Sequence, residues 1–551
     1  MPTFAPMTET YAMPGAPSAR HTLTRGTLAA SVAACFVAQF GVSIPAVING
    51  YANQDMGMSS TQLTWVSDAF MVPVTLFELT FGVLGDLFGR KRLLWIGALL
   101  MVIGALTTFF TPEGHVSVLF TGQAISGLGA AALFPTSVAM LAAGTHTVRD
   151  RAHSLSIWAA SLTTGGFMSP VIGGLLARIH HSGGEFASWR WAFLAEAIIA
   201  LASALITMAA AQNSSAPQGR SLDWAGQITV AIALVALLYS VIQGPSTGWG
   251  SGKIIGGFVV AVIFLIVFVA IELRLEKPLI QLRLFANRMF TISAIVTVLA
   301  MFAYLGTAYD TSIRLSAIQN YSPLKTSVGF ILLNIMGVFL FPVSTKMLEK
   351  FNPGWVLASG AALIGIGDVI LAAIPATHMG LGAVAVPLLV VGAGFKTAVT
   401  SITVVAVNGV PTDKAGMASG ATSMLRDFGL TLGPAIVGAV ALTNAANGIT
   451  AKLAASPALQ KAFDAFNASS QVPPPVKGAV NSGPLGANAI PAPLNPLKDA
   501  AFTSLSHGYA IGFLICGIAA LLAAVIAAVA LGGRSHSAAF VEKAEMTAEA
   551  V

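Results

Sequence analysis

The sequence predicts an all-α integral membrane protein, and three observations lead to this fold class. Apolar runs of about 20 residues, the length that crosses a bilayer as a helix, recur along the whole chain. Only 9% of the 551 residues are charged, whereas a soluble domain has about 25% charged residues. The mean hydropathy of the chain is +0.79. Together these values exclude an ordinary soluble protein.

The apolar runs predict fourteen membrane helices, arranged as two blocks of six with a pair of linker helices between them. The first run, about Leu28 to Gly50, is too long for the core of a signal peptide and is expected to remain as helix one. Glycine and proline patterns recur at matching places in both blocks, which indicates pseudo-repeats. The predicted parts are an N-terminal tail 1–26, a six-helix bundle 27–211, a link 212–220, two linker helices 221–274, a link 275–289, a six-helix bundle 290–532 and a tail 533–551.

One connection inside the second bundle is much longer than the others, at residues 444–506. Its Val472–Pro475 stretch and its glycine, asparagine and alanine content predict a flexible outer loop. A short amphipathic helix on the membrane surface is the alternative for the part from Leu453 to Phe466.

The positions of the basic residues predict the orientation of the chain in an inner or plasma membrane. Arginines occur in the links after helices two, four and eight, and the positive-inside rule places such links in the cytoplasm. Because the number of helices is even, both termini are then cytoplasmic. The net charge of +6 is spread over several links, so a nucleic-acid partner is not expected. Cys35 and Cys516 both lie in apolar runs, so neither a disulfide nor a metal site is expected.

A glycine-rich, basic turn joins the second and third predicted helices, and its key residues are Gly82, Asp86, Gly89, Arg90 and Lys91. The glycines allow close helix contact and a sharp turn, and Asp86 can pair with Arg90 or lie at a helix N-terminus. The pattern resembles the G-x-L-x-D-x-x-G-R-K signature of the major facilitator superfamily, a family of secondary transporters. That resemblance implies a gate at this turn.

A second pattern lies in predicted helix five and consists of Gly165, Ser169, Pro170, Gly173 and Gly174. Proline bends a helix, and small residues four apart let two helix backbones touch. The pattern resembles the antiporter signature of the same superfamily, with a serine at position 169 where glycine is usual. Together with the fourteen helices, it makes the chain similar to the 14-helix drug:proton antiporter branch.

This resemblance implies a secondary active transporter that exports small amphipathic or cationic compounds, such as drugs or toxic metabolites, in exchange for protons. The expected partners are a small-molecule substrate, protons and the lipid bilayer, with the proton gradient in place of a cofactor. A monomer is expected, and a periplasmic adaptor is left open. The alternatives are a narrow-specificity metabolite exporter, a proton-coupled importer and a non-transporting membrane sensor.

An enzyme is not expected from this sequence. An ATP-driven pump needs a phosphate-binding G-x-x-x-x-G-K-[ST] loop, and the sequence has none. The stretch from Gly244 to Gly248 fits the G-x-S-x-G pattern of hydrolases, but it lies in a short loop between predicted membrane helices. We therefore interpret that match as a coincidence.

The chain departs from the antiporter branch at three places. Gln123 stands where the branch has an arginine in helix four, Cys35-Phe36 stands where it has Leu-Asp in helix one, and Glu196 stands where it has an asparagine in helix six. The resemblance ties the missing arginine to proton coupling. Proton antiport is therefore expected to run through different carboxylates or to be altered.

Charged residues inside the predicted helices are the remaining candidates, because each costs about 2.5–3.5 kcal/mol at mid-bilayer. Asp427 is the first proton-coupling candidate, and Asp68 and Glu196 follow. A carboxylate that alternates between dry and wet surroundings can bind and release a proton. Arg426 or Lys396 is expected to hold Asp427 ionised until a proton or substrate arrives. The alternative is a static ion pair that fixes helix packing.

Other embedded charges have weaker claims to a role. Glu78 and Asp368 are candidates without an assigned partner. Asp310 and Arg314 are four residues apart on one predicted helix, so an intrahelical ion pair is expected between them.

Aromatic and thioether side chains are predicted to form the substrate surface, since they can repack around varied ligands. The candidates for the cavity are Phe70, Met301 and Phe302, together with Gln123. Core packing or contact with lipid is the alternative for the three apolar residues. The expected mechanism is rocking of one six-helix block against the other, with the basic turn latching near Lys414 at the start of helix thirteen.

Overall fold

The computed structural model describes residues 23–532, apart from 146–147, 178–187, 217–221, 276–277, 409 and 411–414. The described residues are almost entirely helical and contain no β-strand. Thirteen of their helices are long and apolar enough to cross a membrane, and a shorter apolar helix, Pro323–Phe339, is the fourteenth. The predicted all-α membrane fold is confirmed.

The first half of the chain forms a bundle whose first apolar run is divided into two helices. Pro45 lacks a backbone N–H and stands at the start of the second piece, so the single helix predicted from Leu28 to Gly50 is wrong in this detail. The helices of this half are α1 (Arg25–Ser43), α2 (Pro45–Met56), α3 (Ser60–Phe88), α4 (Arg90–Phe109), α5 (Val116–Gly144), α6 (Val148–Leu176) and α7 (Arg190–Ala210).

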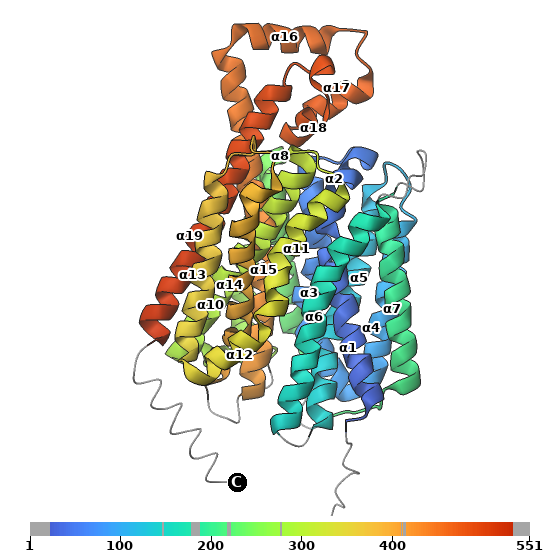
Figure 1. Ribbon diagram of the computed structural model, residues 1–551, viewed down its shortest axis with the longest axis vertical. Coiled ribbons are helices and arrows are strands. Elements are labelled where there is room, and N and C mark those ends of the chain that lie inside the picture. Colours follow the sequence, from blue (N-terminus) through green and yellow to red (C-terminus); the bar gives the residue numbers. More distant parts are fainter. Residues whose placement is uncertain are drawn as a thin grey trace, which may run out of the picture.

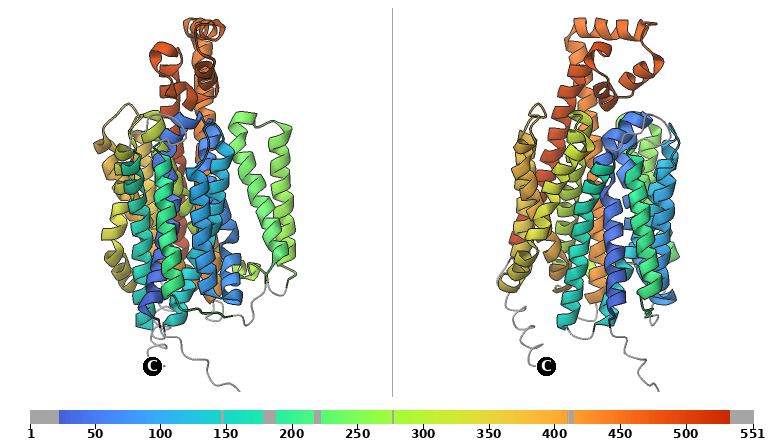
Figure 2. Two further views of the ribbon diagram at one scale, coloured as in Figure 1. Left: turned by 90° about the vertical axis from the view of Figure 1, so that its right-hand side faces the viewer. Right: turned by 45° about the vertical axis from the view of Figure 1, so that its right-hand side comes forward.

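The two linker helices, α8 (Trp224–Thr247) and α9 (Gly252–Glu272), pack against each other at one side of the bundle (Figure 2). Leu234 and Leu238 of α8 pack in one apolar cluster with Leu76 of α3. This position at the side of the bundle is the one expected for helices outside the two repeats.

The second half begins with a 3₁₀ turn and contains a short π-helix between its first two spans. Its main elements are η1 (Leu282–Ala286), α10 (Arg288–Ile313), η2 (Arg314–Ile318), α11 (Pro323–Phe339), α12 (Phe341–Lys350), α13 (Pro353–Ala373), α14 (Leu381–Asn408), α15 (Ala415–Ala455) and α19 (Lys498–Leu531).

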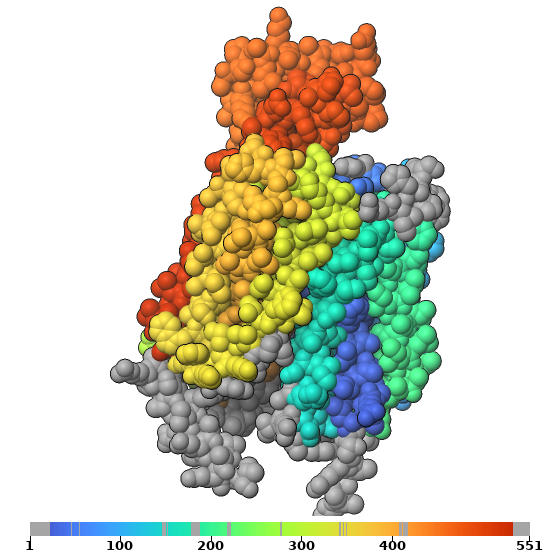
Figure 3. All heavy atoms as spheres, viewed as in Figure 1, coloured from blue at the N-terminus to red at the C-terminus, as the bar shows by residue number. Residues whose placement is uncertain are grey.

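The two halves lie side by side and meet through two pairs of helices, α3 with α15 and α6 with α11 (Figures 1 and 3). In each pair, the second span of one half contacts the fifth span of the other half. This exchange is the contact pattern of two structural repeats related by a pseudo-two-fold axis.

The connection predicted as a flexible loop is helical, which corrects that expectation. Residues 456–497, which we call the extension, contain α16 (Pro457–Ala468), α17 (Pro474–Asn481), α18 (Pro484–Ala489) and η4 (Ala492–Leu494). They extend beyond the bundle on long projections of α15 and α19, with α18 against the bundle and α16 at the far tip (Figures 1 and 3). Phe466, Val480 and Leu497 pack together in a small apolar core of their own.

The extension marks one end of the bundle, and the first and last described residues lie at the opposite end (Figure 1). We call these the extension end and the terminal end. At the extension end, the Asn488 side chain donates to the carbonyls of Ala317 and Ile318 of η2 over 2.9 and 3.2 Å. Ile44 and Ile48 of the first half pack in the same apolar cluster as Ile318.

Candidate functional site

The basic turn between α3 and α4 has the geometry that its glycines predict. Gly89 adopts φ +103°, a conformation that strains residues with a side chain. Arg90 Nε and Nη2 donate to Asp86 Oδ1 over 3.0 and 2.8 Å. A methyl group at Gly82 would make ordinary van der Waals contact with Pro135 of α5, at 3.6 Å. The predicted pairing of Asp86 with Arg90 is therefore present in the structure.

The chain segment after α7 holds this turn, a contact that the sequence analysis missed. The backbone N–H of Arg90 donates to the Ser214 carbonyl over 2.9 Å, and Ala216 donates to the Asp86 carbonyl over 3.0 Å. The Lys91 N–H donates to Asn213 Oδ1 over 3.2 Å. Lys414, the predicted partner of the latch, lies outside the described residues, so that contact stays a prediction.

The glycine and proline pattern of α6 lies where three neighbouring helices approach it. A methyl group at Gly165 would lie 2.5 Å from the Phe36 carbonyl of α1, and Ser169 donates to the Phe40 carbonyl over 2.7 Å. On the other side, Gly174 faces Pro323 of α11. The remaining two members, Pro170 inside α6 and Gly173 beside α7, complete the same packing surface.

A buried charge group lies between the two halves and contains Glu78, Arg426 and Asp427; we call it the Arg426 site. Arg426 Nε donates to Asp427 Oδ1 over 2.7 Å, and Arg426 Nη2 donates to Asp427 Oδ2 over 3.1 Å. Glu78 Oε1 of α3 lies 3.7 Å from the same Nη2. Glu78 is only 4% exposed and Asp427 only 3%. One cation thus faces two buried carboxylates, one from each half.

Hydroxyl groups reinforce the contact between the halves next to this site. Thr75 of α3 donates to the Asp427 carbonyl over 3.1 Å, and its hydroxyl lies 2.6 Å from that of Thr431 in α15. These bonds place Asp427 at the surface where the halves meet. Any rocking that separates α3 from α15 must therefore change the surroundings of the Arg426 site.

Lys396 does not join Asp427, and it lies elsewhere on the boundary between the halves. Its ammonium group is 3.5 Å from the hydroxyl of Thr163 in α6, two residues before Gly165. Nearby, the Tyr304 ring stacks on Phe395 with 3.5 Å between centroids, and the Tyr304 hydroxyl donates to Asn334 over 3.2 Å. We call these five residues the seam. The sequence analysis did not single out Thr163, Asn334 or Phe395, which lack a charge.

The other predicted proton carriers are buried without hydrogen-bond partners for their carboxylate oxygens. Asp68 lies in α3, 0% exposed, and Glu196 lies in α7 against Gly41 of α1. The expected pair of Asp310 with Arg314 is wrong. Arg314 instead donates to backbone carbonyls near the end of α13, where unpaired helical carbonyls attract a cation.

The four predicted cavity residues lie inside the helix bundle. Phe70 and Met301 are 1% and 0% exposed and belong to apolar clusters of the first and second half. Phe302 lies in the same cluster as Met301. Gln123 is fully buried in α5, and its amide has no hydrogen-bond partner. A role in substrate binding stays a prediction for all four.

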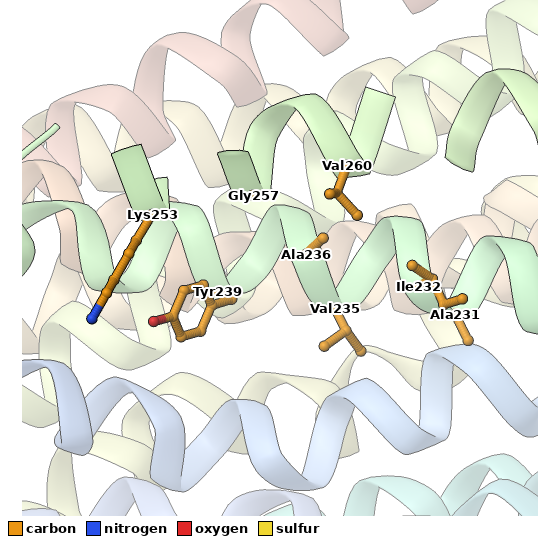
Figure 4. Close-up of a pocket in the computed structure, with 8 residues that line it drawn as sticks. All are labelled: Ala231, Ile232, Val235, Ala236, Tyr239, Lys253, Gly257 and Val260. Carbon is orange, nitrogen blue, oxygen red and sulfur yellow. The ribbon is translucent and has the colours of Figure 1, made fainter. Parts of the chain in front are cut away.

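A shallow apolar groove lies between α8 and α9 and is lined by Val235, Tyr239, Lys253 and Val260 among others (Figure 4). None of the predicted site residues lines it. Within the described ranges, no group of three or more His, Cys, Asp or Glu side chains could hold a metal ion. The boundary between the halves therefore carries the candidate site.

Comparison with known proteins agrees with this architecture. The sequence model of the Major Facilitator Superfamily matches residues 30–434, which is most of the chain. The chain belongs to this superfamily. It is a multi-pass membrane transporter that acts on small molecules, and the resemblance seen in its signature turn is confirmed.

Relatives cover much of the chain. The chain is similar to the multidrug resistance protein Stp of Mycobacterium tuberculosis, with 28% identity over 72% of this chain and 71% of that protein. It is similar to a tetracenomycin C resistance and export protein of Streptomyces glaucescens, with 24% identity over 91% of this chain and 90% of that protein. A bacterial homologue of the lysosomal transporter Spinster, solved in an inward-facing conformation, shares the fold. Its TM-score is 0.59 at 15% identity, and the match covers 94% of this chain and 97% of that one.

Proposed function

We propose that this transporter exports small amphipathic compounds in exchange for protons, and that the Arg426 site couples the two movements. The observation that carries the proposal is the single guanidinium facing two buried carboxylates from opposite halves. A buried ion pair is expensive unless its charges balance. With both carboxylates ionised, the group carries one excess negative charge, and one bound proton removes it.

This charge balance links the proton to the conformation of the transporter. Glu78 belongs to α3 and Arg426 to α15, so separation of these helices removes Glu78 from its cation. Water that enters the gap then solvates the carboxylates and favours their ionised form. A proton is therefore held while the halves are in contact at this level and released when they part.

The seam is our proposed location for the substrate. It joins a stacked aromatic pair, an amide and a hydroxyl at the boundary between the halves. The names of the relatives Stp and the tetracenomycin C exporter support export of drug-like molecules. An aromatic compound with a hydrogen-bond acceptor for Lys396 fits these groups, whereas Lys396 opposes a compound whose only polar group is a cation.

We further propose that the terminal end faces the cytoplasm, because the basic turn between α3 and α4 lies there. The turn, held by Asp86, Arg90 and the segment around Asn213, would then gate the cytoplasmic side. The extension would lie outside, where a periplasmic adaptor would meet it. A monomer suffices, because one chain contains both halves of the Arg426 site.

Accumulation of fluorescent drug analogues in intact cells tests the direction of transport. Cells that produce the chain are expected to accumulate less of a transported compound than cells with an empty vector. A protonophore should remove the difference. Greater accumulation in the producing cells would instead establish a proton-coupled importer of the same fold.

A further inference from the structure

A second buried carboxylate pair lies inside the second half, away from the Arg426 site. Asp310 of α10 and Asp368 of α13 are both 0% exposed. Thr307, one turn before Asp310 on α10, donates to Asp368 Oδ1 over 2.6 Å. Both carboxyl oxygens of Asp310 lack a hydrogen-bond partner, and so does Oδ2 of Asp368. Because Thr307 and Asp310 are three residues apart on α10, both carboxyl groups lie along the same face of that helix.

Helix α19 packs against the pair beside α10 and α13, and a glycine on α19 makes room for a carboxyl group. A methyl group at Gly512 would overlap Asp310 Oδ2 and crowd Val437, so alanine at this position would force the Asp310 side chain to move. Tyr509 lies one turn earlier on α19 and is also buried, at 2% exposed. Three carboxyl oxygens of Asp310 and Asp368 are thus buried without a hydrogen-bond partner, and Asp310 lies against Gly512 of α19.

The groups around the pair supply no positive charge among the residues that the structure describes. Tyr309 of α10, Tyr509 and Cys516 of α19 and Asp68 of α3 are the titratable neighbours from the packed helices. Arg314, which begins η2 one turn beyond Asp310, donates to the carbonyls of Leu371, Ile374 and Pro375 instead.

Two ionised carboxylates without a cation are strongly unfavourable inside a membrane protein. We infer that Asp310 and Asp368 form a second proton-binding site, which holds at least one proton between them while the extension end is closed. The proton is either shared between the two carboxyl groups or bound to one of them. Asp368 can still accept the hydrogen bond from Thr307. Asp310 and Asp368 thus bind protons at a place distinct from Glu78 and Asp427.

The location of the pair gives a route for proton exchange. The Tyr309 hydroxyl lies 2.8 Å from the hydroxyl of Thr64 in α3, so this bond crosses between the halves. Tyr309 also belongs to the apolar cluster that joins the halves at the extension end. Opening of that end breaks the cluster and admits water, which lets the pair release or take up its proton from that side. Only this last step rests on the proposed antiport.

Labelling of the purified full-length chain with dicyclohexylcarbodiimide tests the site directly. This apolar reagent modifies protonated carboxyl groups in apolar surroundings, and peptide mass spectrometry locates the adduct. Label at Asp310 or Asp368 is expected at neutral pH, and its amount should fall as the pH is raised. Because no substrate is added, this result does not depend on whether the chain exports anything.

Matched glycine variants separate the site from general folding. Gly512→Ala should lower labelling of the pair several-fold, since a methyl group displaces Asp310. Gly478→Ala, where the structure leaves open space, should label like the original chain. Equal labelling of the two variants would contradict the role given to Gly512.

Three results would overturn the proton-site assignment. The first is label at Glu78 or Asp427 with none at Asp310 or Asp368. The second is label on the pair that does not change with pH, which would make it a permanently neutral structural contact. The third is protection by sodium chloride but not by choline chloride, which would make the site one for an alkali cation.

Discussion

Asp427 and Glu78 share one guanidinium unequally, and this inequality can be measured. Asp427→Asn removes a carboxylate that receives two N–H donors at 2.7 and 3.1 Å. Removal of one partner of a buried ion pair costs about 3–5 kcal/mol. Because the Arg426 side chain is 25% exposed, we expect the lower end of that range. Glu78 lies 3.7 Å from Arg426, beyond hydrogen-bond range, so Glu78→Gln should cost less than about 1.5 kcal/mol.

Two buried thiols provide the assay for this difference. Cys35 and Cys516 are both fully buried, so a thiol-reactive fluorophore reports when heat opens the bundle in detergent. The melting temperature is expected to fall at least twice as far for Asp427→Asn as for Glu78→Gln. Arg426→Gln combined with Asp427→Asn should be less destabilising than the sum of the single changes. An equal or larger effect of Glu78→Gln would refute this account of the site.

Three further predictions concern the motifs and the packing. Asp86→Asn should abolish export while the protein still inserts, since it weakens both bonds to the arginine of the turn; normal export in cell assays would rule out the gating role. Gly165→Ala should impair export, because its methyl group meets a backbone carbonyl, whereas Gly173→Ala should be tolerated, with its nearest neighbour at 3.7 Å; equal export rates for the two would contradict the packing argument. Arg190→Met should destabilise the protein by about 3–5 kcal/mol, because this fully buried arginine bonds Asp55 and a loop carbonyl; an unchanged melting temperature would show that these bonds add nothing.

The fold could be predicted from the sequence because membrane spans are long and apolar. The extension could be predicted only in part: the alternative of a short helix from Leu453 to Phe466 matches α16, but the other short helices lack such runs and the prolines indicated a loop. Pro457, Pro474 and Pro484 each stand in the first turn of a helix, where a missing N–H has no consequence. Proline followed by a helix-forming run was the signal that could have found them.

The site was predictable only in part, because pairing across helices depends on packing. Asp427 and Arg426 are neighbours in sequence, and their pairing was expected. Glu78 reaches them from the other half, through the contact of α3 with α15, which no local pattern encodes. Helical spacing predicted that Arg314 pairs with Asp310, but its guanidinium instead donates to a free carbonyl at the end of α13.

Proton movement in everted vesicles tests the central claim most directly. An imposed pH gradient is followed by a fluorescent dye while cationic, neutral and anionic amphipathic compounds are added in turn. We predict that at least one compound dissipates the gradient in vesicles with the original chain, and that Asp427→Asn abolishes this response. Dissipation that survives Asp427→Asn would contradict coupling through the Arg426 site. The proton-coupling role would then belong to Asp68, Glu196 or the Asp310–Asp368 pair.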